Sequence, residues 1–203
     1  MLKDSQEREV KFLIRDLSLV ESKLNEFGAT MIQSRVYERN LRFDTPEGSL
    51  SSQNKVLRLR QDNNVYITYK DAGIIQDGIQ QRQEIEISVN DFDTAQRLLN
   101  ALGYEVLMVY EKYRTIYELK TVLVTLDKMP FGDFVEVEGS SAENIRTTSL
   151  QLGLNWENRI LESYTGIFNQ VCAAHNLKFQ DLTFDNFNQI HDSLSKLKFQ
   201  PAD

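Results

Sequence analysis

The chain has 203 residues, enough for one domain with a full hydrophobic core, and its formal net charge is −7 at pH 7. A hydrophobic content of 41% and a charged content of 26% are typical of a soluble globular chain and exclude a disordered one. The negative charge argues against non-specific binding to nucleic acid, and no apolar run approaches the roughly 20 residues that a bilayer-spanning helix needs.

The first expected element is a strand over residues 7–14. Alternate side chains of a strand point the same way, so Glu7, Glu9 and Lys11 share one face. Two carboxylates at this spacing can share a divalent cation, and the lysine beside them can hold a phosphate or accept a proton. The alternative is a solvated strand edge, where Glu and Lys are common.

A helix is expected next, over residues 17–27, because apolar residues recur there at helical spacing. Asp16 can cap its first turn, and Ser18 with Glu21 offers a capping box as an alternative. Gly28 stands where a C-terminal cap belongs.

Strands with one charged and one apolar face follow. Arg58 and Arg60 fall on the face opposite Leu57 and Leu59. Residues 71–80 carry turn signals and are expected to form a hairpin loop. The expected strands cover residues 31–43, 55–61, 65–70 and 81–89, and the last two place Lys70, Arg82, Glu84 and Glu86 on charged faces.

The same order of elements then recurs. A helix over residues 92–102 ends at Gly103 and precedes a strand that carries Lys112 and Arg114. A strand over residues 121–127 ends with Asp127, and the next one, over 134–139, carries Glu136 and Glu138 before a helix over 140–152. Three strand–helix units thus follow one another, and each opens with Glu-x-Glu, at residues 7–9, 84–86 and 136–138. Strand–helix–strand units resemble one another in general, which explains the repeated helices. That general resemblance explains the three Glu-x-Glu motifs poorly.

After Trp156 the apolar spacing predicts a helix that ends near His175 and a shorter helix over residues 187–197. We expect residues 1–170 to form the main domain, with residues 171–203 as a helical extension packed on it. His175 and His191 are isolated from each other and from any cysteine, so a zinc site is not expected.

Together these elements predict an α+β fold: an eight-stranded antiparallel β-barrel, or tunnel, with surrounding helices and a helical C-terminal segment. If the apolar faces pack on the helices, the charged faces line the lumen, and a barrel of this size can hold one small ligand. Carboxylates suit Mg²⁺ or Mn²⁺, and Arg and Lys suit phosphate oxygens. The expected lumen residues are Glu7, Glu9, Lys11, Arg58, Arg60, Lys70, Arg82, Glu84, Glu86, Lys112, Arg114, Asp127, Glu136 and Glu138.

The N-terminal residues and the single cysteine bear on location. Residues 1–9 are too polar for a signal peptide, and Cys172 has no second cysteine with which to form an intrachain disulfide. Both features fit a reducing cytoplasm. Cys172 lies in an expected helix interior, where a packing role is favoured over a nucleophilic one.

Glu7-x-Glu9-x-Lys11 resembles the signature of the CYTH, or triphosphate tunnel metalloenzyme, superfamily. The resemblance covers roughly residues 5–170 in the right order. It extends through Phe43-Asp44-Thr45-Pro46, Leu57-Arg58-Leu59-Arg60, Tyr69-Lys70, Glu84-x-Glu86, Glu111-Lys112-x-Arg114, Asp127, residues 134–139 and Ser163-Tyr164. The chain departs from the family at Asn40 and Arg42, where members often carry an acidic residue and a tyrosine.

The resemblance implies an eight-stranded tunnel that acts on triphosphates with Mg²⁺ or Mn²⁺ as cofactor. It implies catalytic roles for Lys11 and Glu9, with Lys11 contacting phosphate and helping to position or activate water. The implied metal ligands are Glu7, Glu9, Glu136 and Glu138, assisted by Asp127 or by Glu84 and Glu86. The implied triphosphate-binding residues are Lys11, Arg58, Arg60, Lys70, Lys112 and Arg114, and we add Arg82 from the lumen set.

Three functions stay open at this point. We favour hydrolysis of the terminal phosphate of an inorganic or organic triphosphate, because the sequence shows no recognisable base-reading motif. The alternatives are a class IV adenylate cyclase, which makes cyclic AMP and pyrophosphate from ATP, and a non-catalytic polyphosphate- or nucleotide-binding module. The expected partner is a triphosphate-containing small molecule rather than nucleic acid or membrane, and a homodimer is left open.

Overall fold

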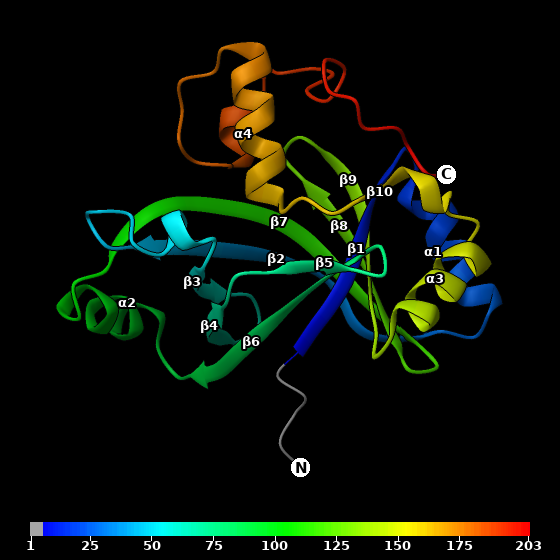
Figure 1. The fold of residues 1–203 in the computed structure, drawn as a ribbon, viewed down its shortest axis with the longest axis horizontal. Coiled ribbons are helices and arrows are strands. Elements are labelled where there is room, and N and C mark those ends of the chain that lie inside the picture. The colour runs from blue at the N-terminus through cyan, green and yellow to red at the C-terminus, as the bar shows by residue number, and fades with distance from the viewer. Residues whose placement is uncertain (1–5) are drawn as a thin grey trace.

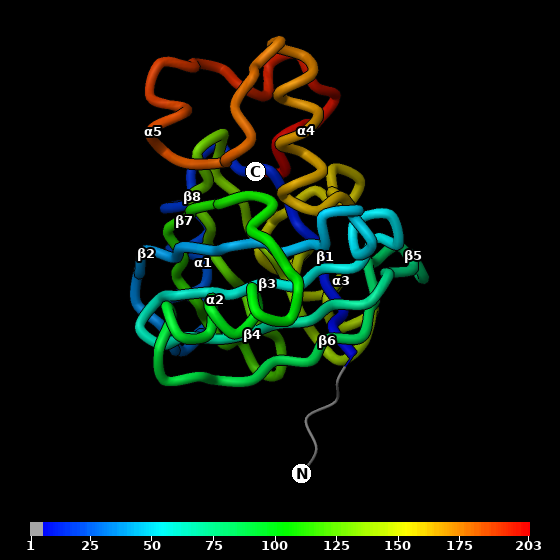
Figure 2. Tube along the Cα trace, turned by 90° about the vertical axis from the view of Figure 1, so that its left-hand side faces the viewer, coloured from blue at the N-terminus to red at the C-terminus, as the bar shows by residue number. Residues whose placement is uncertain are grey.

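A computed structural model describes residues 6–203 of the chain, and its main feature is a closed barrel (Figures 1 and 2). Within these residues the strands are β1 (Gln6–Ile14), β2 (Thr30–Asp44), β3 (Val56–Gln61), β4 (Val65–Lys70), β5 (Ile74–Gln76), β6 (Ile79–Val89), β7 (Glu105–Leu119), β8 (Val122–Met129), β9 (Gly132–Glu138) and β10 (Arg159–Ile160).

The barrel closes through β1, which pairs with two strands at once. Glu9 lies opposite Glu138 of β9 and also opposite Gln80 of β6, both in antiparallel register. The ring therefore runs β1-β9-β8-β7-β2-β3-β4-β6 and returns to β1, while β5 and β10 lie outside it. The predicted eight-stranded antiparallel barrel is confirmed.

Five α-helices within residues 6–203 surround the barrel. They are α1 (Leu17–Glu26), α2 (Phe92–Ala101), α3 (Ala142–Gln151), α4 (Tyr164–His175) and α5 (Phe184–Phe187). Asp16 caps α1 by accepting a hydrogen bond from the Ser18 backbone N–H, and Gly28 after the helix adopts a φ of +73°. None of the helices in this part of the chain combines the length and apolar character that a bilayer crossing requires.

The helices cover the apolar outer faces of the strands in three clusters. Helices α1 and α3 pack on β1, β8 and β9, where Phe12 and Val137 are fully buried. Helix α2 covers the outer face of β2 and β3 around Leu59. Helix α4 and the segment after it cover the end formed by Phe134 and Tyr110, above the barrel in Figure 1. Because apolar residues face outward to these helices, alternate polar residues are directed inward.

The hairpin expected over residues 71–80 is present, and it contains β5 and the start of β6, which pair antiparallel. Two expectations about helices are wrong. Ile160, expected in a helix, belongs to β10 and pairs with Lys11 of β1. The helix expected over residues 187–197 is replaced by α5 and irregular turns. The apolar side chains of this segment pack with those of α4, but the backbone that carries them is irregular. The spacing of apolar residues alone does not distinguish this arrangement from a helix.

The expected domain boundary at residue 170 falls inside α4, which runs on to His175. The expectation about the polar N-terminus concerns residues 1–9, of which residues 1–5 lie outside the described part of the chain.

Asp44 at the end of β2 organises the loop that follows it. Its buried carboxylate accepts hydrogen bonds from the backbone N–H groups of Thr45, Leu50 and Ser51, and from the Ser51 hydroxyl. Burial would raise the pKa of this carboxyl, but the hydrogen bonds outweigh that effect and lower it.

Asp44→Ala is therefore expected to lower the free energy of unfolding by about 2–3 kcal/mol, because several buried donors lose a charged acceptor. Folding lowers the pKa of Asp44. Its contribution to the free energy of unfolding is therefore fully present above the unfolded-state pKa and is lost as the pH falls through the folded-state pKa. Urea unfolding at pH 7 measures the difference. The matched control is Glu47→Ala, which removes an exposed carboxylate from the same loop. Equal unfolding free energies for the two variants would contradict this role.

Candidate functional site

The inward-facing side chains enclose a cavity of about 770 Å³ inside the barrel. Thirteen of the fourteen expected lumen residues line it; Asp127 is the exception. The charged side chains on its wall are Glu7, Glu9, Lys11, Arg42, Arg58, Arg60, Lys70, Arg82, Glu84, Glu86, Lys112, Arg114, Glu136 and Glu138. The alternation read from the sequence therefore placed most of the polar wall correctly.

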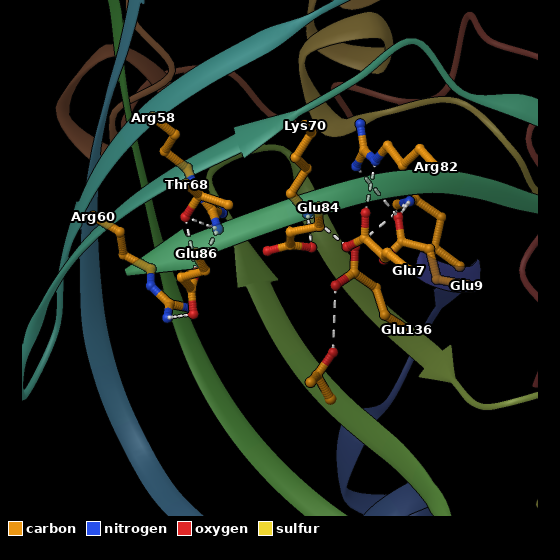
Figure 3. Close-up of polar contacts among 12 residues, drawn as sticks. Glu7, Glu9, Arg58, Arg60, Thr68, Lys70, Arg82, Glu84, Glu86 and Glu136 are labelled. Carbon is orange, nitrogen blue, oxygen red and sulfur yellow. Dashed lines mark hydrogen bonds and ion pairs between the residues drawn. The ribbon is translucent and has the colours of Figure 1, made fainter. Parts of the chain in front are cut away.

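Glu7 joins three strands at the β1–β6 side of the cavity (Figure 3). Its carboxylate oxygens accept hydrogen bonds from Lys70 Nζ of β4 and, at 2.6 Å, from Arg82 Nε of β6. Lys70 also pairs with Glu84 at 3.0 Å. These groups stay close because Glu7 lies opposite Arg82 and Lys70 lies opposite Glu84 in the strand registers.

A second group of charges lies on β3 and its neighbours. Glu86 pairs with Arg58 at 3.6 Å and with Arg60 at 3.4 Å, and Thr68 links Arg58 to Glu86 (Figure 3). Glu38 of β2 lies behind Arg60, with Nη1 to Oε2 at 3.9 Å, and is fully buried. Burial would raise the pKa of Glu38, but the surrounding Lys and Arg charges lower it to about 2.

Asp127 anchors a third group beneath the side chains that line the cavity. Arg114 donates to both Asp127 and Glu136, and Lys112 Nζ lies 3.3 Å from Asp127. The Tyr164 hydroxyl, at the start of α4, donates to the same carboxylate at 2.9 Å. Asp127 is fully buried, so it orients these groups instead of facing the cavity itself.

Lys11 is almost completely buried at the centre of the charged wall. Its Nζ lies 3.2 Å from Glu9 Oε1 and 3.5 Å from Glu136 Oε1, and 5.3 Å from the centre of the Tyr164 ring. Burial lowers the pKa of Lys11, but Glu9 and Glu136 together outweigh burial and raise it. The two neighbouring carboxylates therefore favour the cationic form of Lys11.

Acidic side chains crowd together near Glu138. Burial first, and then repulsion from Glu7, Glu9 and Glu84, raise the pKa of Glu138 to about 7. Across residues 6–203, no three acidic, His or Cys side chains converge closely enough to form a ready-made metal centre. Most of the acidic groups are instead paired with Lys and Arg, as at Glu7 and Glu136.

The structure adds wall residues that sequence reasoning missed. Arg42 and Tyr110 line the cavity, and Glu38 supports it from β2. Residues 38, 40 and 42 are an alternating polar set, and the register shifts of β2 against β7 lie on either side of this stretch. Tyr164 and Thr165 enter from the first turn of α4, a placement that only the tertiary fold provides.

The model of the CYTH domain family matches residues 5–152 of the chain. The chain belongs to the CYTH domain family. This CYTH chain is 27% identical over 140 residues to MJ0240 of Methanocaldococcus jannaschii, which bears a provisional adenylate cyclase name; the match covers 68% of the chain and 78% of that protein. It is 29% identical over 135 residues to adenylate cyclase CyaB of Aeromonas hydrophila, covering 64% of the chain and 67% of CyaB.

Solved structures share the CYTH fold. A Vibrio parahaemolyticus protein, also with a provisional adenylate cyclase name, superposes with a TM-score of 0.73 at 22% identity, over 82% of the chain and 99% of that protein. HpAC1 from Hippeastrum, described as a provisional adenylyl cyclase with a dominant triphosphatase activity, superposes with a TM-score of 0.61 at 17% identity, over 81% of the chain and 95% of HpAC1. At these identities the likeness concerns the fold.

Proposed function

We propose that this CYTH chain hydrolyses the terminal phosphate of a triphosphate in a reaction that depends on Mg²⁺ or Mn²⁺. The observation that carries the proposal is the cavity wall, where many cations face one enclosed space. Arg42 and Arg58 each bury an Nε atom that has no hydrogen-bond partner within residues 6–203. Donors that are buried and unmet in this way fit a bound polyanion.

The proposed triphosphate ligands are the seven paired cations of the wall. Guanidinium and ammonium groups form their strongest hydrogen bonds with charged oxygens, and the cavity shields those bonds from solvent. Phosphoryl transfer requires mostly positioning and charge stabilisation, so the wall needs no covalent nucleophile. The seven residues are Lys11, Arg58, Arg60, Lys70, Arg82, Lys112 and Arg114.

The acidic part of the wall fits a hard divalent cation. Its donors are carboxylate oxygens, which Mg²⁺ and Mn²⁺ prefer, and the repulsion around Glu138 is the kind that a bound cation relieves. Once bound, the ion would offset phosphate charge and supply an activated water. Asp127 would position Lys112 and Arg114 without itself contacting the ion. The proposed ligands are Glu7, Glu9, Glu136 and Glu138, with Glu84 and Glu86 assisting.

Lys11→Ala tests the role of the buried lysine. Because Lys11 is held as a cation by Glu9 and Glu136, we expect it to stabilise charge that develops during the reaction. The variant should lower kcat by about 10²-fold while KM changes far less. Steady-state kinetics with tripolyphosphate measure both constants, and Lys128→Ala, which removes a half-exposed lysine, is the control. A rise in KM with kcat unchanged would restrict Lys11 to binding.

A class IV adenylate cyclase is the second candidate, favoured by the adenylate cyclase names of the two relatives. The same wall would bind ATP, but the 3′-hydroxyl would then attack the α-phosphate. The products decide between the two functions, because a cyclase releases cyclic AMP and pyrophosphate, whereas a hydrolase releases orthophosphate.

The deciding experiment incubates the purified protein with ATP, thiamine triphosphate and inorganic tripolyphosphate, with Mg²⁺ or Mn²⁺, and identifies the products by ³¹P NMR. Orthophosphate release supports the hydrolase. Cyclic AMP with pyrophosphate identifies the cyclase. Binding of these ligands without turnover identifies a non-catalytic binding module, against which the many carboxylates on the wall argue.

A further inference from the structure

Arg42 extends from β2 into the cavity beside the first turn of α4. It is half-buried, and its Nη1 donates a hydrogen bond of 2.8 Å to the Thr165 hydroxyl. Thr165 is in turn within 3.0 Å of Ser163, the N-cap of α4. The guanidinium is therefore held in place by one hydroxyl group, which Ser163 contacts in turn, and not by a carboxylate.

Arg42 differs from every other cation on the wall. Each of the seven others forms at least one ion pair with Asp or Glu. Among residues 6–203, Arg42 forms none, and its buried Nε has no hydrogen-bond partner. A partly desolvated cation that forms no ion pair is costly, so this position is suited to an anion from outside the protein.

The neighbours of Arg42 act on it in opposite directions. Burial lowers the pKa of Arg42; Tyr110 and Asp44 oppose this effect, and the charges of Arg82 and Arg58 reinforce it. Burial acts in the same direction on Arg58 and Arg82, yet their partners raise both pKa values. Three guanidinium groups from β2, β3 and β6 thus influence the same region, and only one of them lacks an acidic partner.

The aromatic side chains of the wall are already engaged by cations. The guanidinium of Arg60 lies 4.5 Å from the centre of the Tyr66 ring, and Lys112 Nζ lies 5.4 Å from the centre of the Tyr164 ring. The Tyr110 hydroxyl lies 3.2 Å from Arg58. The hydrogen bonds of Arg42 and Thr165 themselves involve hydroxyl groups, which suit a phosphate oxygen better than a nucleobase ring.

We propose that Arg42 and the Thr165 hydroxyl form a phosphate subsite that selects inorganic tripolyphosphate over triphosphates that carry an organic group. The proposal rests on the proposed function and adds its substrate class. Both end phosphates of tripolyphosphate carry more charge than the esterified phosphate of ATP, which bears the nucleoside. An extra unpaired cation therefore favours the ligand that has a terminal phosphate at each end.

Isothermal titration without divalent metal, which prevents turnover, tests the subsite. Tripolyphosphate and ATP are titrated into the wild type, Arg42→Gln and Thr165→Val. The control is Arg97→Gln, which removes an exposed arginine on α2. We expect Arg42→Gln to weaken tripolyphosphate binding about tenfold and ATP binding less than about threefold. The tripolyphosphate affinity of Thr165→Val should lie between those of the wild type and Arg42→Gln. Thermal melting verifies that each variant is folded.

An equal loss for both ligands, or no loss, would overturn the selective subsite. Pyrophosphate is titrated in parallel to separate this proposal from the proposed function. If the wild type binds neither triphosphate and also releases no orthophosphate from them with Mg²⁺ or Mn²⁺, the proposed function fails. The anion subsite then stands if pyrophosphate binding depends on Arg42, and falls if that binding is absent or unaffected by the substitution.

Discussion

Turnover of tripolyphosphate is expected to stop when excess chelator removes divalent cations, and to fall at least about hundredfold in Glu9→Gln or Glu138→Gln. A bound metal contributes several kcal/mol of charge stabilisation, and each 1.4 kcal/mol corresponds to about tenfold in rate. The amide keeps the shape of the carboxylate but is a poor ligand for Mg²⁺. Both variants should remain folded, because replacing Glu138 relieves its repulsion from Glu7, Glu9 and Glu84.

The readout is kcat/KM over a titration of Mg²⁺ and, separately, Mn²⁺. Glu157→Gln is the matched control, since the Glu157 side chain is 80% exposed and is not one of the proposed metal ligands. Full activity in chelator, or unchanged turnover in both variants, would remove the metal from the mechanism.

The second large effect is expected at Arg114, where binding and stability are linked. Its guanidinium holds Asp127 and Glu136 together, and Asp127 is fully buried. Arg114→Ala should weaken tripolyphosphate binding about tenfold or more. It should also lower the free energy of unfolding by about 3–5 kcal/mol, because the buried carboxylate of Asp127 loses its main partner.

Arg58→Ala separates these two contributions. Its acidic partner, Glu86, has a side chain that is 27% exposed, so water can solvate the carboxylate once the arginine is gone. We expect a similar loss of affinity with a much smaller loss of stability. Isothermal titration and urea unfolding of both variants measure the two quantities. Wild-type affinity in both variants would mean that the cationic wall is structural and would end the triphosphate assignment.

The barrel was predictable because charged and apolar residues alternate along most of its strands. The faces of β3 follow directly from Leu57-Arg58-Leu59-Arg60, since a strand directs alternate side chains to opposite sides. The segment after α4 was not predictable in the same way. Its apolar residues pack on α4 from irregular backbone, so their spacing imitates a helix that the structure does not contain.

The site was predictable where one strand carries several charged residues, as in Glu7-x-Glu9-x-Lys11. It was not predictable where the role of a residue depends on a distant segment. Glu38 becomes important through Lys112 of β7, and Arg42 through Thr165 of α4. Asp127 lies on the same face of β8 as the cavity-lining Thr125, as its sequence position indicated, but Lys112, Arg114 and Tyr164 cover it.

The double pairing of β1 has a consequence for how the chain folds. β1 spans residues 6–14, but its partners β6 and β9 span residues 79–89 and 132–138. During synthesis from the N-terminus, more than half of the chain must therefore be made before β1, with its many charges, can pair with β9 and close the ring. Such distant pairings make folding slow, and the charges on β1 discourage its edges from pairing with other chains during that delay.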